Sequence, residues 1–133
     1  MRSLCLFVLT VVFFVASCSK SSNNGDSGSL AGDWRLTAYY GGFAQIHVQV
    51  PDDSMVVLSL HKDSTFQKLV NRQIMGSGAY HVFFTSTGIA GDSAWHIIFE
   101  NSGDGGLYTV NKDTLLISGL PYDGLEYRYL RQH

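Results

Sequence analysis

Apolar and polar residues alternate along most of the chain after residue 30, with the period of two that is typical of strands with one buried face. In residues 34–40, Trp34, Leu36, Ala38 and Tyr40 alternate with more polar residues. Residues 43–50 fit a short helix or a strand equally well. The alternation therefore predicts eight strands, at residues 34–40, 56–60, 65–70, 80–84, 95–99, 107–110, 114–118 and 125–129.

Short turn sequences separate the predicted strands. Residues 62–64 and 111–113 leave room only for tight antiparallel hairpins. Further breaks are expected at the glycine-rich residues 76–78 and 103–106 and at residues 121–124. Eight short strands joined in this way predict an all-β domain with a meandering antiparallel sheet, closed into a barrel or folded into a sandwich. Closure is favoured because it leaves no exposed strand edge.

The first part of the chain has a different pattern. Arg2 precedes an almost entirely apolar run at residues 4–15, which is too short to span a bilayer, and small residues then lead to Cys18. This layout resembles a bacterial lipoprotein signal, in which a peptidase cuts before the cysteine of a lipobox and the thiol carries the lipid. The resemblance implies a signal peptide over residues 1–17 and a membrane anchor at Cys18. The alternative is an ordinary secretory signal with Cys18 as an incidental thiol.

Residues 19–29 contain no aliphatic or aromatic side chain. Such a segment cannot offset its ordering entropy by burial, so we expect a flexible tether. The expected organisation is a signal over residues 1–17, a lipidated cysteine and tether over residues 18–29, and one domain over residues 30–133, large enough for a single modest core. Ser19, without an acidic run after it, resembles sorting to the outer membrane on its periplasmic side.

Composition narrows the function classes. The chain has 9 Lys and Arg against 11 Asp and Glu, and loss of Arg2 with the signal leaves 8 basic residues and a charge of about −3. No basic surface for nucleic acid is expected. Of the 2 cysteines, Cys5 lies in the signal and Cys18 is the expected lipid site. Neither a disulfide scaffold nor a cysteine metal cluster is therefore available to the domain.

Several short motifs of residues 30–131 resemble, in their order and spacing, the small lipocalin-like domains carried on bacterial lipoproteins. Gly32-Asp33-Trp34 looks like the Gly-x-Trp opening of lipocalins, and the other matching pieces are residues 40–43, 62–66, 78–80, 111–115 and 122–129. The resemblance implies an eight-stranded antiparallel up-and-down β-barrel of lipocalin-like type. It also implies that Gly32, Trp34 and Arg131 form a plug at one barrel end. Arg131 shares the parity of Tyr127 and Tyr129, so it can point to the buried side.

Residues that could carry catalysis or hold a metal are scattered. His47, His61, His81 and His96 occur singly, with no two on one predicted strand, which favours exposed polar positions over a zinc site. The aspartates of the domain lie mostly in turns, and no loop has the alternating acids of a calcium site. Nothing pairs a nucleophile with a base. We therefore expect no enzyme activity, no metal and no cofactor.

Aromatic residues make up 13% of the chain. They can fill a narrow barrel, which bulky inward residues favour, or line a pocket for one apolar or amphipathic molecule. The leading hypothesis is a lipid-anchored envelope protein that captures a small hydrophobic ligand at the open barrel end. The alternative is a non-catalytic structural or interaction module that binds an envelope protein. Candidate lining residues are Trp34, Tyr40, Phe84, Trp95 and Tyr127.

Overall fold

A computed structural model describes residues 29–42, 44–87, 92–102, 105–119 and 124–133. All of the regular structure within these ranges is strand. Over the same residues, no helix is long and apolar enough to cross a membrane. In chain order the strands are β1 (Gly32–Gly41), β2 (Ile46–Gln49), β3 (Val56–Leu60), β4 (Thr65–Val70), β5 (Gln73–Ser86), β6 (Ser93–Phe99), β7 (Gly105–Asn111), β8 (Thr114–Ser118) and β9 (Leu125–Arg131).

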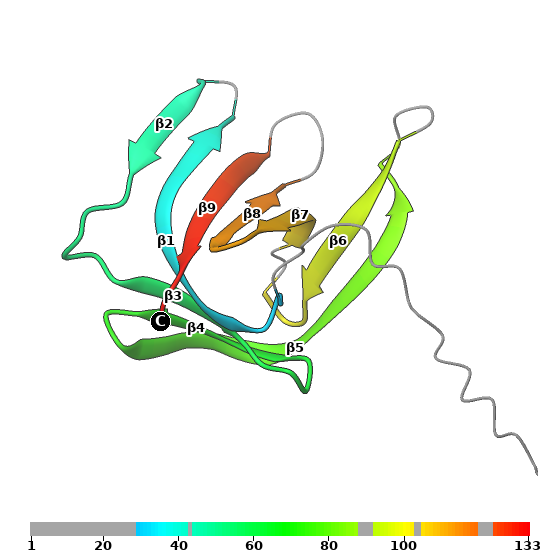
Figure 1. Cartoon of the computed structure of the whole chain (residues 1–133). Helices are drawn as coiled ribbons and strands as arrows, with labels where there is room; N and C mark the ends of the chain where they lie inside the picture. Colours follow the sequence, from blue (N-terminus) through cyan, green and yellow to red (C-terminus); the bar gives the residue numbers. More distant parts are fainter. Residues whose placement is uncertain (1–28, 43, 88–91, 103–104, 120–123) are drawn as a thin grey trace, which may run out of the picture.

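Antiparallel pairing closes these strands into a barrel (Figure 1). Strands β3 to β9 follow one another around the wall, and β9 returns to pair with β1. The other edge of β1 is divided between β3, along residues 32–35, and β2, along residues 38–41. Eight strands therefore form the closed wall, and β2 adds a strand beside it. The predicted eight-stranded antiparallel barrel of lipocalin-like type is confirmed, and the ambiguous segment at residues 43–50 contributes the ninth strand.

The break predicted at residues 76–78 is wrong, because these residues lie inside β5. The chain turns instead at Asn71 and Arg72, whose φ angles are positive, at 50° and 68°. A two-residue turn with two positive φ angles matches the twist of an antiparallel hairpin, and its usual residues include asparagine. The glycines of residues 76–78 are therefore strand glycines, and the β4–β5 hairpin is tighter and longer than the sequence indicates.

The core occupies the barrel interior. Its largest fully buried side chains are Trp34, Leu60, Ile97 and Leu115. Trp34 and Leu60 lie near the end of the barrel at which β1 begins, and Leu115 lies near the same end because β8 pairs there with the last residues of β9. Dense packing is therefore concentrated at this end, which we call the closed end.

Trp34 fills the closed end. Its side chain has 0% exposure, and its indole Nε1 donates a hydrogen bond of 2.8 Å to the carbonyl oxygen of Leu30. The Arg131 guanidinium lies over the indole, with Cζ 4.1 Å from the ring centroid. A cation over an indole face is attracted by the ring quadrupole, which adds to the burial of the two side chains.

Arg131 also ties the start of the described chain to the barrel. Its guanidinium donates hydrogen bonds to the carbonyl oxygens of Ala31 and Ser29. Gly32 makes room for this side chain, because a Cβ at position 32 would collide with Nη1 of Arg131. The φ angle of 148° at Gly32 is likewise one that other residues rarely adopt. The structure thus gives a physical reason for glycine two residues before the plugging tryptophan.

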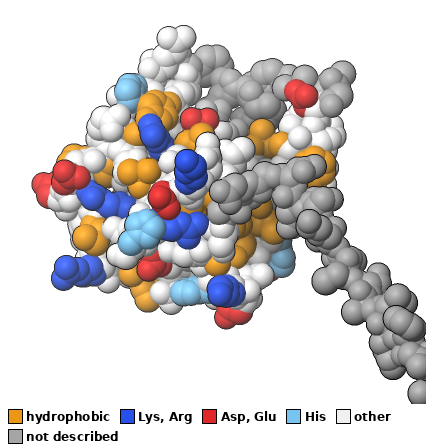
Figure 2. Space-filling model, viewed as in Figure 1, with side chains coloured by type: hydrophobic (Ala, Val, Ile, Leu, Met, Phe, Trp, Pro, Cys, Tyr) orange, Lys and Arg blue, Asp and Glu red, His pale blue; other side chains and the backbone are white. Residues whose placement is uncertain are grey.

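The surface of the domain is mixed. On the face drawn in Figure 2, basic and acidic side chains are interspersed with apolar ones rather than gathered by sign. Arg35 and Asp52 form one ion pair of opposite charges at 2.8 Å. The small excess of acidic residues over basic ones is therefore not concentrated on this face.

Candidate ligand cavity

A cavity of about 460 Å³ lies in the barrel interior away from the Trp34 plug. Its wall includes the first residues of β3, β7 and β9 and Gly119, which follows β8. Because the strands are antiparallel, all of these positions lie at the barrel end opposite the start of β1. We call it the open end. The lining residues are Val56, Leu58, Phe66, Lys68, Phe99, Ser102, Gly105, Ile117, Gly119, Leu125, Tyr127 and Tyr129.

Glycines help to leave this space empty. Gly105 and Gly119 line the cavity without contributing a side chain. A Cβ on Gly105 would lie 2.6 Å from the carbonyl oxygen of Ile97, and one on Gly119 would lie 3.1 Å from Cα of Gly124. These contacts are with backbone atoms, so larger residues would require the strands to move apart. Glycine at positions 105 and 119 therefore allows both the close approach of the neighbouring backbone and the open space beside it.

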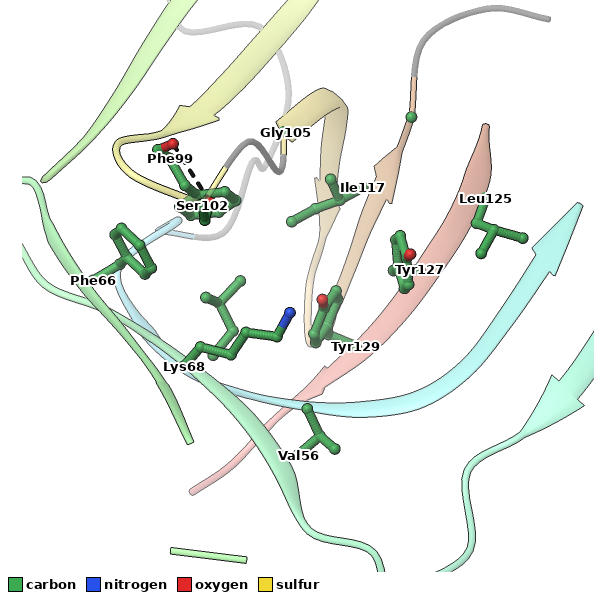
Figure 3. Close-up of a pocket in the computed structure, with 12 residues that line it drawn as sticks. Val56, Phe66, Lys68, Phe99, Ser102, Gly105, Ile117, Leu125, Tyr127 and Tyr129 are labelled. Atoms are coloured by element: carbon green, nitrogen blue, oxygen red, sulfur yellow. Dashed lines mark hydrogen bonds between the residues drawn. The ribbon is translucent and has the colours of Figure 1, made fainter. Parts of the chain in front are cut away.

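The cavity wall is amphipathic. Leu58 and Ile117 contribute aliphatic surface, and the rings of Phe66 and Phe99 meet edge to face at a centroid distance of 4.8 Å. The polar groups come from Ser102, Lys68 and two tyrosines, Tyr127 and Tyr129. Figure 3 shows Tyr127 and Tyr129 side by side on β9, with Lys68 reaching toward Tyr129 from the opposite wall. Such a wall suits a molecule with a large apolar part and a small polar part.

Ser102 is one of the polar residues of the cavity wall. Its hydroxyl donates a hydrogen bond of 3.5 Å to the carbonyl oxygen of Phe99 (Figure 3). Two tyrosines outside the cavity wall have a raised pKa. Burial raises the pKa of Tyr108 and of Tyr80, and the hydroxyl of Tyr80 donates a hydrogen bond of 2.9 Å to the carbonyl oxygen of His61. These shifts favour neutral phenols in the folded state.

Of the five candidate lining residues, Tyr127 lies in the cavity wall. Trp34 is inside the barrel but belongs to the plug at the closed end. Tyr40 lies in a separate, shallower groove together with Glu126 and Arg128. A β-bulge in β1, between Leu36 and Ala38, explains this position.

The bulge shifts the alternation of β1 by one residue. Beyond it, Tyr39 pairs with Tyr127, and the two rings lie 6.2 Å apart. Tyr40 instead pairs with Glu126 and packs its ring against His47 of β2 at 4.6 Å. Uninterrupted alternation predicts that Tyr40 lies on the side of Tyr127, whereas the bulge places Tyr39 there.

Phe84 and Trp95 lie outside the cavity, although they share the phase of buried residues on their strands. Their exposed fractions are 59% and 50%, and their rings contact each other at a centroid distance of 5.4 Å. The reason is the length of the β5–β6 hairpin: β6 pairs with β7 only along residues 96–98. The rest of the hairpin stands away from β7, as the right side of Figure 1 shows.

Lys68 lines the cavity but is not among the five candidate residues drawn from the sequence. Lys68 lies two residues after Phe66 in β4, so strand alternation alone places both side chains on the same face. Phe66 is buried in the core, which identifies that face as the interior. The alternation of β4 therefore indicates that Lys68 lies on the same face as Phe66. Lysine side chains are mostly exposed, so composition alone does not suggest this position.

No cluster of three or more His, Cys, Asp or Glu side chains that could hold a metal occurs within the described ranges. His81 and Glu100 form an exposed pair at 2.9 Å, and Asp63 accepts hydrogen bonds from Thr65, which lower the pKa of its carboxyl group. These contacts are local surface and turn interactions. The cavity is therefore the candidate site from which we argue a function.

Comparison with known proteins adds no relative: no protein-family model, no curated protein and no solved structure matches the chain. The closed eight-stranded antiparallel barrel is consequently the class that the structure itself defines.

Proposed function

We propose that this protein binds one small apolar or amphipathic molecule in the cavity at the open end. The observation that carries the proposal is the volume of about 460 Å³ inside a closed barrel. Ligand pockets span about 300–1,000 Å³, and eight-stranded barrels either pack solid or hold one small ligand. A barrel filled by its own aromatic side chains would leave no space of this size. The amphipathic wall described above further supports a ligand with an apolar body.

The ligand proposal predicts saturable binding of an uncharged hydrophobic probe. Phenylnaphthylamine should become fluorescent on titration with the full chain, purified without detergent because detergent would compete for the cavity. Val56→Trp places a large ring inside the cavity and should weaken binding by at least about tenfold, equivalent to about 1.4 kcal/mol. Fluorescence titration measures both affinities.

Gln67→Trp is the matched control for this experiment. Gln67 lies between Phe66 and Lys68 in β4, on the opposite face of the strand, and should leave the affinity unchanged. A flat titration up to the solubility limit of the probe would reject the proposed function. Equal loss in both tryptophan variants would show that binding occurs elsewhere.

A protein-interaction role is the second candidate, and the β5–β6 hairpin is the observation that favours it. Phe83, Phe84, Trp95 and Ile98 are all exposed there by more than a third of their surface. Exposed apolar groups of this kind often mark interaction surfaces. If the probe does not bind in the cavity, this second role becomes the better account of the protein.

The membrane attachment at Cys18 is also part of the proposal. Its support is the order of a basic residue, an apolar run and small residues before this cysteine. The contact of Arg131 with Ser29 holds the start of the described residues at the closed end, and the cavity lies at the opposite end of the barrel. We propose the periplasmic side of the outer membrane as the location, where an accessible cavity mouth could exchange ligand with its surroundings.

Attachment through Cys18 predicts that Cys18→Ser loses the membrane-bound form. Without the thiol no lipid can be added, and the chain should remain uncleaved or appear in the soluble fraction. Membrane fractionation followed by immunoblotting makes the measurement, with Ser17→Ala as a control that keeps a small residue before the cysteine. An unchanged distribution of Cys18→Ser would overturn the lipoprotein assignment.

A further inference from the structure

The β5–β6 hairpin carries most of the large apolar side chains that are exposed in the described residues. Five of the nine lie there: Val82, Phe83, Phe84, Trp95 and Ile98. Apart from two histidines, neither strand carries a side chain that is charged near neutral pH. Exposed strands usually carry charged side chains, lysine above all, which prevent association. The hairpin is therefore both apolar and uncharged at a position where charge is expected.

The outer part of the hairpin is a two-stranded ribbon that the neighbouring strands leave uncovered. β4 pairs with β5 only as far as Ala79, and β7 pairs with β6 only along residues 96–98. Beyond these points β5 and β6 continue to pair with each other up to Ser86 and Ser93, and the ribbon projects from the barrel in Figure 1. All six residues from His81 to Ser86 are consequently exposed, on both faces of the ribbon.

Apolar side chains project from both of these faces. Phe84 and Val82 share one face with Trp95, because Phe84 and Trp95 are direct partners across the two strands. Phe83 and Ile98 lie on the opposite face. A second copy of the chain or another folded protein would pack against one face of the ribbon. A lipid surface can surround the ribbon and cover both faces, so the two-sided exposure favours lipid.

We propose that the β5–β6 hairpin enters the interfacial layer of a lipid bilayer. Trp95 supplies an aromatic group that prefers this layer, because the indole combines an apolar ring with an N–H donor. Phe83 and Phe84 supply apolar surface on the two faces. The free strand edges can bind water and headgroups in the interfacial layer, whereas the hydrocarbon core offers no such partners. Insertion is therefore shallow, to a depth of about 5–10 Å.

This inference goes beyond the cavity function and does not depend on it. None of the five exposed side chains of the hairpin lines the cavity. The inference also requires no lipid on Cys18, because the hairpin makes its own contact with a bilayer. Its test can therefore fail while the proposed ligand binding stands, and the reverse is equally true.

Depth-dependent quenching of tryptophan fluorescence tests the contact. The purified full chain is mixed with phosphatidylcholine vesicles whose lipids are brominated either near the headgroup or near the chain ends. Trp95 should be quenched, and more strongly by bromine near the headgroup, because the insertion is shallow. Trp34 has 0% exposure and should stay unquenched, so Trp95→Phe should remove the quenching in both kinds of vesicle.

Two aspartate variants on opposite faces separate a lipid surface from a partner on one side. Phe83→Asp and Phe84→Asp each introduce a charge that is costly to place in lipid, so both should remove the quenching of Trp95. Ile74→Asp is the matched control, because Ile74 lies at the other end of β5 and has the same exposed fraction as Phe84, 59%. It should leave the quenching unchanged. Circular dichroism checks that each variant is folded.

Absence of quenching in the unmodified chain would overturn the proposal, as would quenching that persists in Trp95→Phe. Loss of quenching in Phe84→Asp but not in Phe83→Asp would indicate contact on one face only, and would overturn it as well. If the true occupant is a second copy, the chain should form a concentration-dependent dimer without lipid, Phe84→Asp should dissociate it, and brominated vesicles should not quench Trp95.

Discussion

Trp34→Ala should lower the free energy of unfolding by about 3–5 kcal/mol, the range for removing a large buried aromatic side chain from a core. Trp34 has 0% exposure and is one of the largest fully buried side chains of the barrel. The loss includes the hydrogen bond from Nε1 to Leu30 and the contact with the Arg131 guanidinium at 4.1 Å. Urea unfolding followed by circular dichroism measures the change.

A double-mutant cycle separates the Trp34–Arg131 contact from the burial of each side chain. Arg131→Ala should cost less than Trp34→Ala, and the loss in the double variant should be smaller than the sum of the single losses. Arg128→Ala is the control, because Arg128 is exposed on the same strand and should combine additively with Trp34→Ala. Additive losses for Trp34 and Arg131 would show that the stacked pair contributes no coupling energy.

The barrel could be predicted because each wall strand carries its own alternation of apolar and polar residues. Trp34 and Leu36 in β1 and Tyr127 and Tyr129 in β9 identify the buried face before any partner is known. Turn chemistry was less reliable: Gly76 and Gly78 lie inside a strand, while Asn71 and Arg72 form the turn. Glycine permits a turn but does not require one, so the pairing of neighbouring strands decides its position.

The candidate site was harder to predict because it depends on relations between strands. The bulge in β1 moves Tyr39 to the side of Tyr127 and Tyr40 away from it, and no local signal in residues 34–41 marks that bulge. Phe84 and Trp95 have inward parity, but their place in the barrel depends on how far β7 pairs with β6. Parity predicts which face a side chain is on, whereas the length of strand pairing determines whether that face is enclosed.

Gly106→Ala should strongly destabilise the barrel, by about 3 kcal/mol or more. A Cβ at this position would collide with the carbonyl oxygen of Ser118 on the neighbouring strand β8. Overpacking a core usually costs about 1–3 kcal/mol, and the cost here should reach or exceed that upper value because the obstructing atom belongs to the backbone and cannot change rotamer. The midpoint of urea unfolding should fall accordingly, provided that the slope of the transition is unchanged.

Gly76→Ala is the matched control, since it makes the same chemical change in another strand of the barrel. No heavy atom lies within 4 Å of a Cβ built at Gly76, and its φ angle is not in the positive range that disfavours alanine. Alanine should therefore be neutral or stabilise by about 0.4–1 kcal/mol, because it restricts the unfolded chain without straining the folded one. Equal unfolding midpoints for the two variants would contradict the close approach of β7 and β8. A large difference would show that the strand spacing beside the cavity is set by backbone contact, and that position 106 tolerates only glycine.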